Sequence, residues 1–129
     1  MIIYIHFIHI QNSLVEISGL RDIREILSIS REEAAKILRV SSRNIYRWEH
    51  DINIRPHFNL VARISKFKEL EKVLLDTFKK KDIDDWLNTP NEALEGRTPI
   101  QEIISARTAE EGIQSIIDLL TNVKYGVFT

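Results

Sequence analysis

The chain contains no cysteine, which excludes a disulfide framework and a thiolate zinc site and is typical of a protein of the reducing cytosol. It also lacks any stretch of about twenty apolar residues, the length that a helix needs to cross a membrane. The apolar segment 1–10 has neither the basic start nor the small-residue cleavage site of a signal peptide. We therefore expect a cytoplasmic protein without membrane contact, in which residues 1–18 form a short strand or an ordered arm packed on its own or a neighbouring subunit.

Motifs that carry catalytic chemistry are also missing. The sequence has no glycine-rich phosphate loop and no nucleophile elbow. His6 and His9 would lie on opposite faces of a strand, and no carboxylate lies close to them in sequence. We expect no metal site, no cofactor and no enzymatic activity.

The chain is moderately apolar, and its charges are distributed unevenly along the sequence. Its 129 residues are 43% hydrophobic, which suits one globular domain or two small helical modules that share a core. Residues 1–82 carry 15 basic and 11 acidic side chains, whereas residues 83–129 carry 3 and 8. A basic front half and an acidic rear half indicate two different partners, although solvated helix faces with a chance asymmetry would look the same.

Apolar residues recur at helical spacing along most of the chain, which predicts an all-α protein. Ser30, Ser41, Thr98 and Thr108 each precede such a run and are good N-caps. The stripe from about residue 58 to 80 is longer, and it is either continuous or broken once. We divide the chain into an extension (1–18), a helix-turn-helix module (19–57), a connecting helix or helices (58–82) and a small helical domain (83–129).

Residues 20–50 read as helix, short helix, tight turn and helix, the order of a helix-turn-helix. Ile45 and Trp48 are three positions apart and would face the core. The opposite face would expose side chains that suit DNA, because arginine grips guanine edges and hydroxyls hold phosphate. The candidate DNA-binding residues are Ser42, Arg43, Tyr46 and Arg47, flanked by Arg39 and Arg55.

This pattern, including its Arg47-Trp48-Glu49 end, resembles the Cro/Xre class of helix-turn-helix. The class usually carries glycine where this chain has Arg39. A dimer of such modules would place two reading helices about 34 Å apart and bind a roughly palindromic operator.

The most distinctive segment runs from residue 85 to 100. A helix should end at Trp86-Leu87, because Thr89-Pro90 disfavours helical backbone. Gly96 suits a left-handed stop, and Thr98-Pro99 should open the next helix.

Together with the tail 123–129, this segment resembles the toxin-binding domain of Xre/MbcA/ParS-type antitoxins, the partners of RES-domain toxins that attack NAD. The resemblance covers residues from about 66 to 129, with a threonine at position 121 where glycine is usual. It implies that the rear domain covers the toxin's active-site cleft, within a homodimer or a larger complex. The residues expected to reach the cleft are Lys124, Tyr125, Gly126, Val127, Phe128 and Thr129.

The sequence therefore favours the antitoxin of a toxin–antitoxin pair, which binds a RES-type toxin and regulates its own operon through DNA. Two alternatives stay open. One is a stand-alone transcription regulator whose rear domain only dimerises, and the other is a toxin-neutralising module without DNA binding. Tyr125 and Phe128 could also simply anchor the chain end on its own core.

Overall fold

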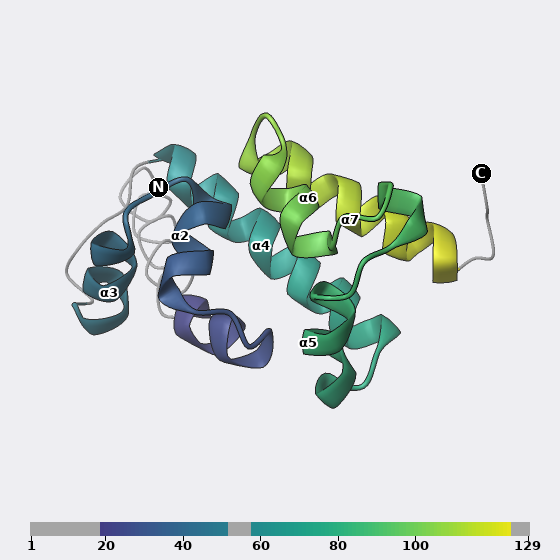
Figure 1. The fold of residues 1–129 in the computed structure, drawn as a ribbon. Coiled ribbons are helices and arrows are strands. Elements are labelled where there is room, and N and C mark those ends of the chain that lie inside the picture. The colour runs from purple at the N-terminus through teal and green to yellow at the C-terminus, as the bar shows by residue number, and fades with distance from the viewer. Residues whose placement is uncertain (1–18, 52–57, 125–129) are drawn as a thin grey trace, which may run out of the picture.

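All regular secondary structure that the computed structural model describes, in residues 19–51 and 58–124, is helical, which confirms the all-α prediction. The expected arm or strand over residues 1–18 lies outside the described residues. Residues 19–26 are helical. The elements that follow are α2 (Arg31–Leu38), α3 (Ser42–His50), α4 (Phe58–Thr77), α5 (Lys80–Leu87), the 3-10 turn η1 (Glu92–Leu94), α6 (Pro99–Ser105) and α7 (Ala109–Lys124) (Figure 1).

Helix α4 joins the two ends of the molecule. It packs along α7 and also contacts α2 and α5, while α3 and the end of α7 lie far apart, at opposite ends in the view of Figure 1. Its inward stripe is the one that the sequence predicts, and it is buried at Leu60, Ile64, Phe67, Leu70 and Leu74. Each large apolar side chain removed from water in this way contributes about 1.5–3 kcal/mol to stability.

The buried side chains form one continuous cluster that extends from the segment 19–29 through α2, α3 and α4 into α6 and α7. The front and rear halves therefore share a core. Helix α7 contributes the inward face that the sequence predicts, which consists of Ile113, Ile116, Ile117 and Leu120. The domain boundaries at residues 57 and 82 stay predictions.

The predicted caps open their helices. The hydroxyls of Ser30, Ser41 and Thr108 accept hydrogen bonds from the backbone N–H three residues later, at 3.1 Å in each case. At the start of α6, Thr98 and Gln101 form a complete capping box, with bonds of 3.1 and 2.9 Å in the two directions. Each cap satisfies backbone donors that the helix leaves free, and its loss typically costs about 1 kcal/mol.

The turn between α5 and α6 follows the sequence-based prediction closely. Helix α5 ends at Leu87, and Gly96 has a φ of +85°. Glu95 also adopts a left-handed conformation, with φ at 56°, and η1 adds a turn that the sequence does not predict. Asn91 closes the loop, because its carbonyl oxygen accepts the Gly96 N–H and its own N–H reaches Arg97 O, both at 3.0 Å.

Helices α6 and α7 approach each other closely at Gly112. A β-carbon there would come within 2.7 Å of the carbonyl oxygen of Ile103 and 2.9 Å of the Ala106 side chain. Only glycine allows this approach without moving backbone atoms. Residues 103–112 are called the α6–α7 corner below.

Candidate interaction surfaces

Helices α2 and α3 are two short helices joined by a tight turn, as the sequence predicts. The turn passes through Arg39, whose φ of 59° and ψ of 45° place it in the left-handed region. Ile45 and Trp48 are buried on the inner side of α3, and Ala35 is buried on α2. These placements agree with the prediction that α3 has one buried face.

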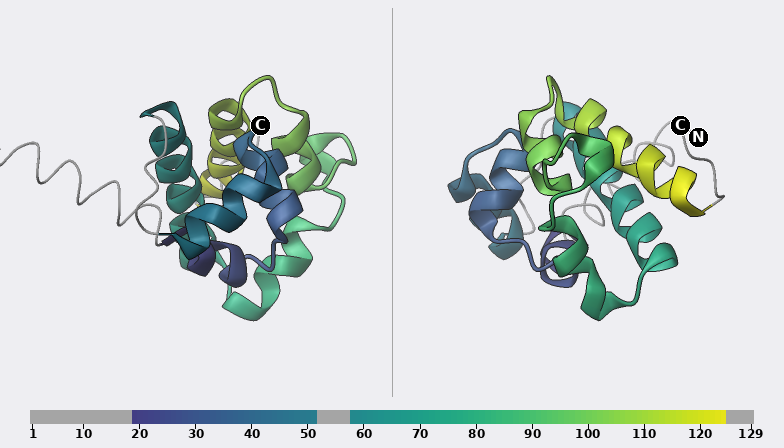
Figure 2. Two further views of the ribbon diagram at one scale, coloured as in Figure 1. Left: turned by 90° about the vertical axis from the view of Figure 1, so that its left-hand side faces the viewer. Right: turned by 45° about the vertical axis from the view of Figure 1, so that its right-hand side comes forward.

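The outer face of α3 carries Arg43, Tyr46 and Arg47, which are all exposed. Figure 2 (left) turns this end of the molecule toward the viewer. Neither guanidinium group makes a hydrogen bond or an ion pair with any residue that the structure describes, so both are available to a ligand.

Tyr46 is held in place on this face although half of it is exposed. Its ring stacks on His50, with 4.0 Å between the ring centroids. The Arg31 guanidinium carbon lies 5.0 Å from the centre of the Tyr46 ring, within the range of a cation–π contact. His50 in turn forms a 2.8 Å hydrogen bond between its Nδ1 and Tyr46 O. The Tyr46 ring therefore has a fixed orientation on this face.

A buried carboxylate anchors α3 to the rest of the front half. Glu49 pairs with Arg24 at 2.8 Å and with Arg31 at 3.1 Å, and its side chain has no solvent-exposed area. Burial alone would raise the pKa of Glu49, but the hydrogen bonds and charges of the two arginines outweigh it and hold that pKa below its usual value. This ion-pair network is not predicted by the sequence, because its three residues belong to different helices.

The other candidate DNA contacts have different surroundings. The Arg39 side chain is turned toward the rear half, where its guanidinium donates to Ile103 O and Ala106 O. Ser42, in the first turn of α3, is partly buried. Arg55 lies outside the described residues.

The candidate toxin-binding residues lie at the end of α7 and beyond it. Lys124 is the last residue of that helix, and residues 125–129 lie outside the described range. Thr121, the departure from the usual glycine, is exposed and donates its hydroxyl to Ile117 O at 2.8 Å within α7. A threonine is therefore accommodated at this position without a change in the helix.

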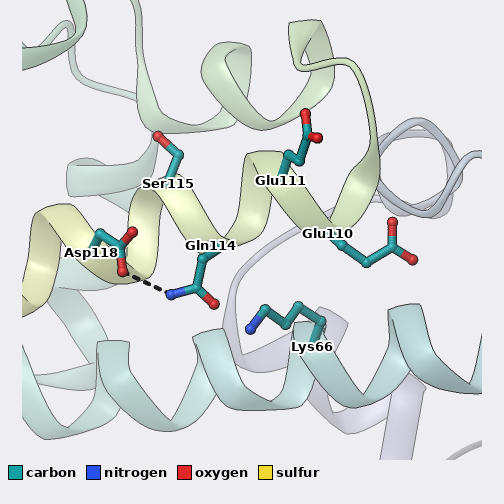
Figure 3. Close-up of a pocket in the computed structure, with 6 residues that line it drawn as sticks. All are labelled: Lys66, Glu110, Glu111, Gln114, Ser115 and Asp118. Carbon is teal, nitrogen blue, oxygen red and sulfur yellow. Dashed lines mark hydrogen bonds between the residues drawn. The ribbon is translucent and has the colours of Figure 1, made fainter.

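An open, polar hollow lies between α4 and α7 (Figure 3). Lys66 extends from α4 toward Gln114, and Gln114 donates a 2.7 Å hydrogen bond to Asp118. The remaining lining residues are Glu110, Glu111 and Ser115. The hollow is shallow, and three of its six lining residues are acidic.

Within the residues that the structure describes, no three histidine or acidic side chains come close enough together to hold a metal ion. None of the helices in 19–51 and 58–124 has both the length and the apolarity of a membrane span.

Comparison with known proteins identifies the rear half. A search among curated proteins gave no match. The fold is similar to a chain of the crystal structure of the M. tuberculosis MbcT–MbcA toxin–antitoxin complex, with a TM-score of 0.66 and 22% identity, over 88% of this chain and 96% of that one. The family model of the antitoxin Xre/MbcA/ParS C-terminal toxin-binding domain matches residues 74–126. This confirms the resemblance and favours a binding protein over an enzyme: residues 74–126, from the end of α4 through α7, match the C-terminal toxin-binding domain of Xre/MbcA/ParS antitoxins.

Proposed function

We propose that the protein is the antitoxin of a toxin–antitoxin pair, and that its rear domain binds a RES-type, NAD-consuming toxin and blocks the active site. The observation that carries this proposal is the match of residues 74–126 to a toxin-binding domain. The similar fold of a chain from the MbcT–MbcA complex supports it. The partner is thus a toxin protein, and the site of action is the cytoplasm.

Blockade requires a part of the antitoxin that can enter a cleft. We assign this role to Lys124 and the tail 125–129, which continue from the end of α7. Tyr125 and Phe128 offer large contact areas at a low entropic cost, and Gly126 allows the backbone to come close. The competing role of these aromatic residues is to anchor the chain end on its own domain.

We further propose that α2 and α3 form a helix-turn-helix that binds the promoter of the operon. The exposed and unpaired guanidinium groups of Arg43 and Arg47 support this proposal, as does the fixed position of Tyr46 beside them. Arginines in this arrangement can reach guanine in the major groove, while Ser42 at the start of the helix can contact phosphate. A homodimer or a larger complex with the toxin would bind a palindromic operator.

Two experiments test the two halves of the proposal separately. For the rear half, the tagged chain is co-expressed with the product of the adjacent open reading frame. A stable complex supports the proposal, whereas a toxic neighbour that does not bind contradicts it. For the front half, mobility-shift titrations use the DNA upstream of the gene. No retardation at low salt, where electrostatic binding is strongest, would reject DNA binding and leave a toxin-neutralising module.

A further inference from the structure

One arginine joins the C-terminal ends of two helices that lie far apart in the sequence. The guanidinium of Arg39 donates to Lys36 O at 2.6 Å, in the last turn of α2. It also donates to Ile103 O at 3.1 Å and to Ala106 O at 2.9 Å, at the end of α6. The last carbonyls of a helix have no partner within the helix and carry partial negative charge. A single cation therefore satisfies acceptors of both halves of the protein.

The backbone at Arg39 shows that this contact has a cost. Its φ of 59° belongs to the left-handed region, which glycine adopts freely and other L-residues adopt only at an energetic cost. Glycine would make the same turn with less strain, but it has no side chain to reach α6. The presence of arginine at position 39 is therefore explained by the contacts of its side chain and not by the conformation of the turn.

A second arginine strengthens the same junction. Arg63 of α4 donates to Leu38 O at 2.9 Å, and it lies 3.6 Å from a Glu110 carboxylate oxygen in the first turn of α7. The Ile103 carbonyl that Arg39 contacts is also the one packed against Gly112. The end of α6 is therefore held between the Arg39 side chain on one side and α7 on the other.

We infer that Arg39 is a coupling device. Its hydrogen bonds to Ile103 and Ala106, here named the Arg39 latch, link the α2–α3 turn to the α6–α7 corner. A partner that binds one half then changes the local stability of the other half. The identity of the two partners, toxin and DNA, rests on the proposed function. By thermodynamic linkage, each partner then changes the protein's affinity for the other by the same factor.

The first test needs no partner. Arg39→Gly keeps the left-handed turn and removes the latch together with the bond to Lys36 O within α2. Hydrogen exchange is then measured at the amides of Ala106 and Gly112. Because the latch consists of charge-assisted hydrogen bonds, we expect its loss to speed hydrogen exchange at these two amides by roughly ten- to a hundredfold. Amides in the centre of α4 serve as an internal reference, so that a general loss of stability is recognised as such.

Arg107→Ala is the matched control. It removes another arginine from the same corner, but one that is mainly exposed and whose side chain, among the described residues, pairs only with Glu111. We expect its effect on Ala106 and Gly112 to stay within about twofold, as is usual for surface ion pairs. Arg39→Asn, which also tolerates the left-handed turn, replaces Arg39→Gly if the glycine variant fails to fold. If Ala106 and Gly112 exchange as slowly in the Arg39 variant as in the Arg107 control, the latch does not stabilise the α6–α7 corner and the inference is rejected.

The second test measures coupling itself. DNA affinity is determined with and without saturating toxin, for the wild-type chain and for Arg39→Gly. For the wild type, we expect the ratio of DNA affinity with toxin to DNA affinity without toxin to differ from one by about fivefold or more. For Arg39→Gly, the same ratio should approach one. A variant ratio equal to the wild-type ratio, or a wild-type ratio of one, would overturn the coupling. A wild-type chain that binds neither partner would instead reject the proposed function, and the exchange experiment would still decide whether the latch links the two halves.

Discussion

The carboxylate of Glu49 accepts a 2.8 Å hydrogen bond from Arg24, and the Glu49 side chain is fully shielded from solvent. Arg31 completes the network from the start of α2 and also lies against the exposed ring of Tyr46. The orientation of α3, and with it the outer face that carries Arg43 and Arg47, therefore depends on one buried charge.

Replacing this charge should destabilise the front half. In Glu49→Gln the two arginines lose their counter-ion while the side-chain volume is kept, so we expect the free energy of unfolding to fall by about 2–4 kcal/mol. Urea unfolding at neutral pH measures the effect. Glu25→Gln is the control, since that glutamate forms only an exposed pair with Arg21 and should change stability by less than about 1 kcal/mol.

The same residue predicts a pH dependence. Because the folded-state pKa of Glu49 is lowered, its contribution is present above the pKa of the unfolded chain and is lost as the pH falls through the folded-state pKa. The difference in stability between the wild type and Glu49→Gln should therefore shrink on acidification from neutral pH to about pH 3. A constant difference over that range would mean that folding does not shift the pKa of Glu49.

Arg43→Ala and Arg47→Ala should each weaken operator binding by roughly 1–3 kcal/mol if the arginine contacts a base. Toxin binding should be unchanged, because both side chains lie on the outer face of α3. Mobility-shift and co-purification assays measure the two activities. If both variants bind operator as tightly as the wild type, neither Arg43 nor Arg47 contacts a DNA base.

Gly112→Ala should lower the free energy of unfolding by about 1–3 kcal/mol, since the new methyl group would meet the backbone at Ile103. Ser115→Ala, one turn further along α7 and only partly buried, is the control and should be close to neutral. Thermal unfolding compares the two variants. A neutral Gly112 variant would show that α6 and α7 can separate at no cost.

Deletion of residues 125–129 should abolish toxin neutralisation and leave the helical content intact. The described core is complete without these residues, because α7 buries its apolar face through Leu120. Circular dichroism checks the fold and a growth assay checks neutralisation. Full protection by the truncated chain would move the blocking role to another segment.

Much of the fold could be predicted from the sequence because the signals are local. Ser41, Thr98 and Pro99 mark helix starts through their own chemistry, and the buried stripe of α4 follows from helical spacing alone. The left-handed turn at Gly96 is of the same kind. These features need no knowledge of what lies opposite them in space.

The features that the sequence analysis missed depend on contacts between distant residues. The sequence predicts a DNA contact for Arg39, and it gives no sign that the Arg39 guanidinium donates to the carbonyls of Ile103 and Ala106, because only the packing of α2 against α6 brings them within reach. The sequence indicates Glu49 only as part of a motif, because its partners Arg24 and Arg31 belong to other elements. The roles of Arg43, Arg47 and the tail 125–129 stay predictions, since they depend on partners outside the chain.

The measurement that tests the central claim most directly is cellular NAD and growth after induction of the adjacent open reading frame, with and without this chain. We expect NAD to collapse and growth to stop when the neighbour is expressed alone, and both to recover when the chain is co-expressed. A neighbour without toxicity, or a toxicity that this chain leaves unchanged, would contradict the antitoxin function and favour a stand-alone regulator.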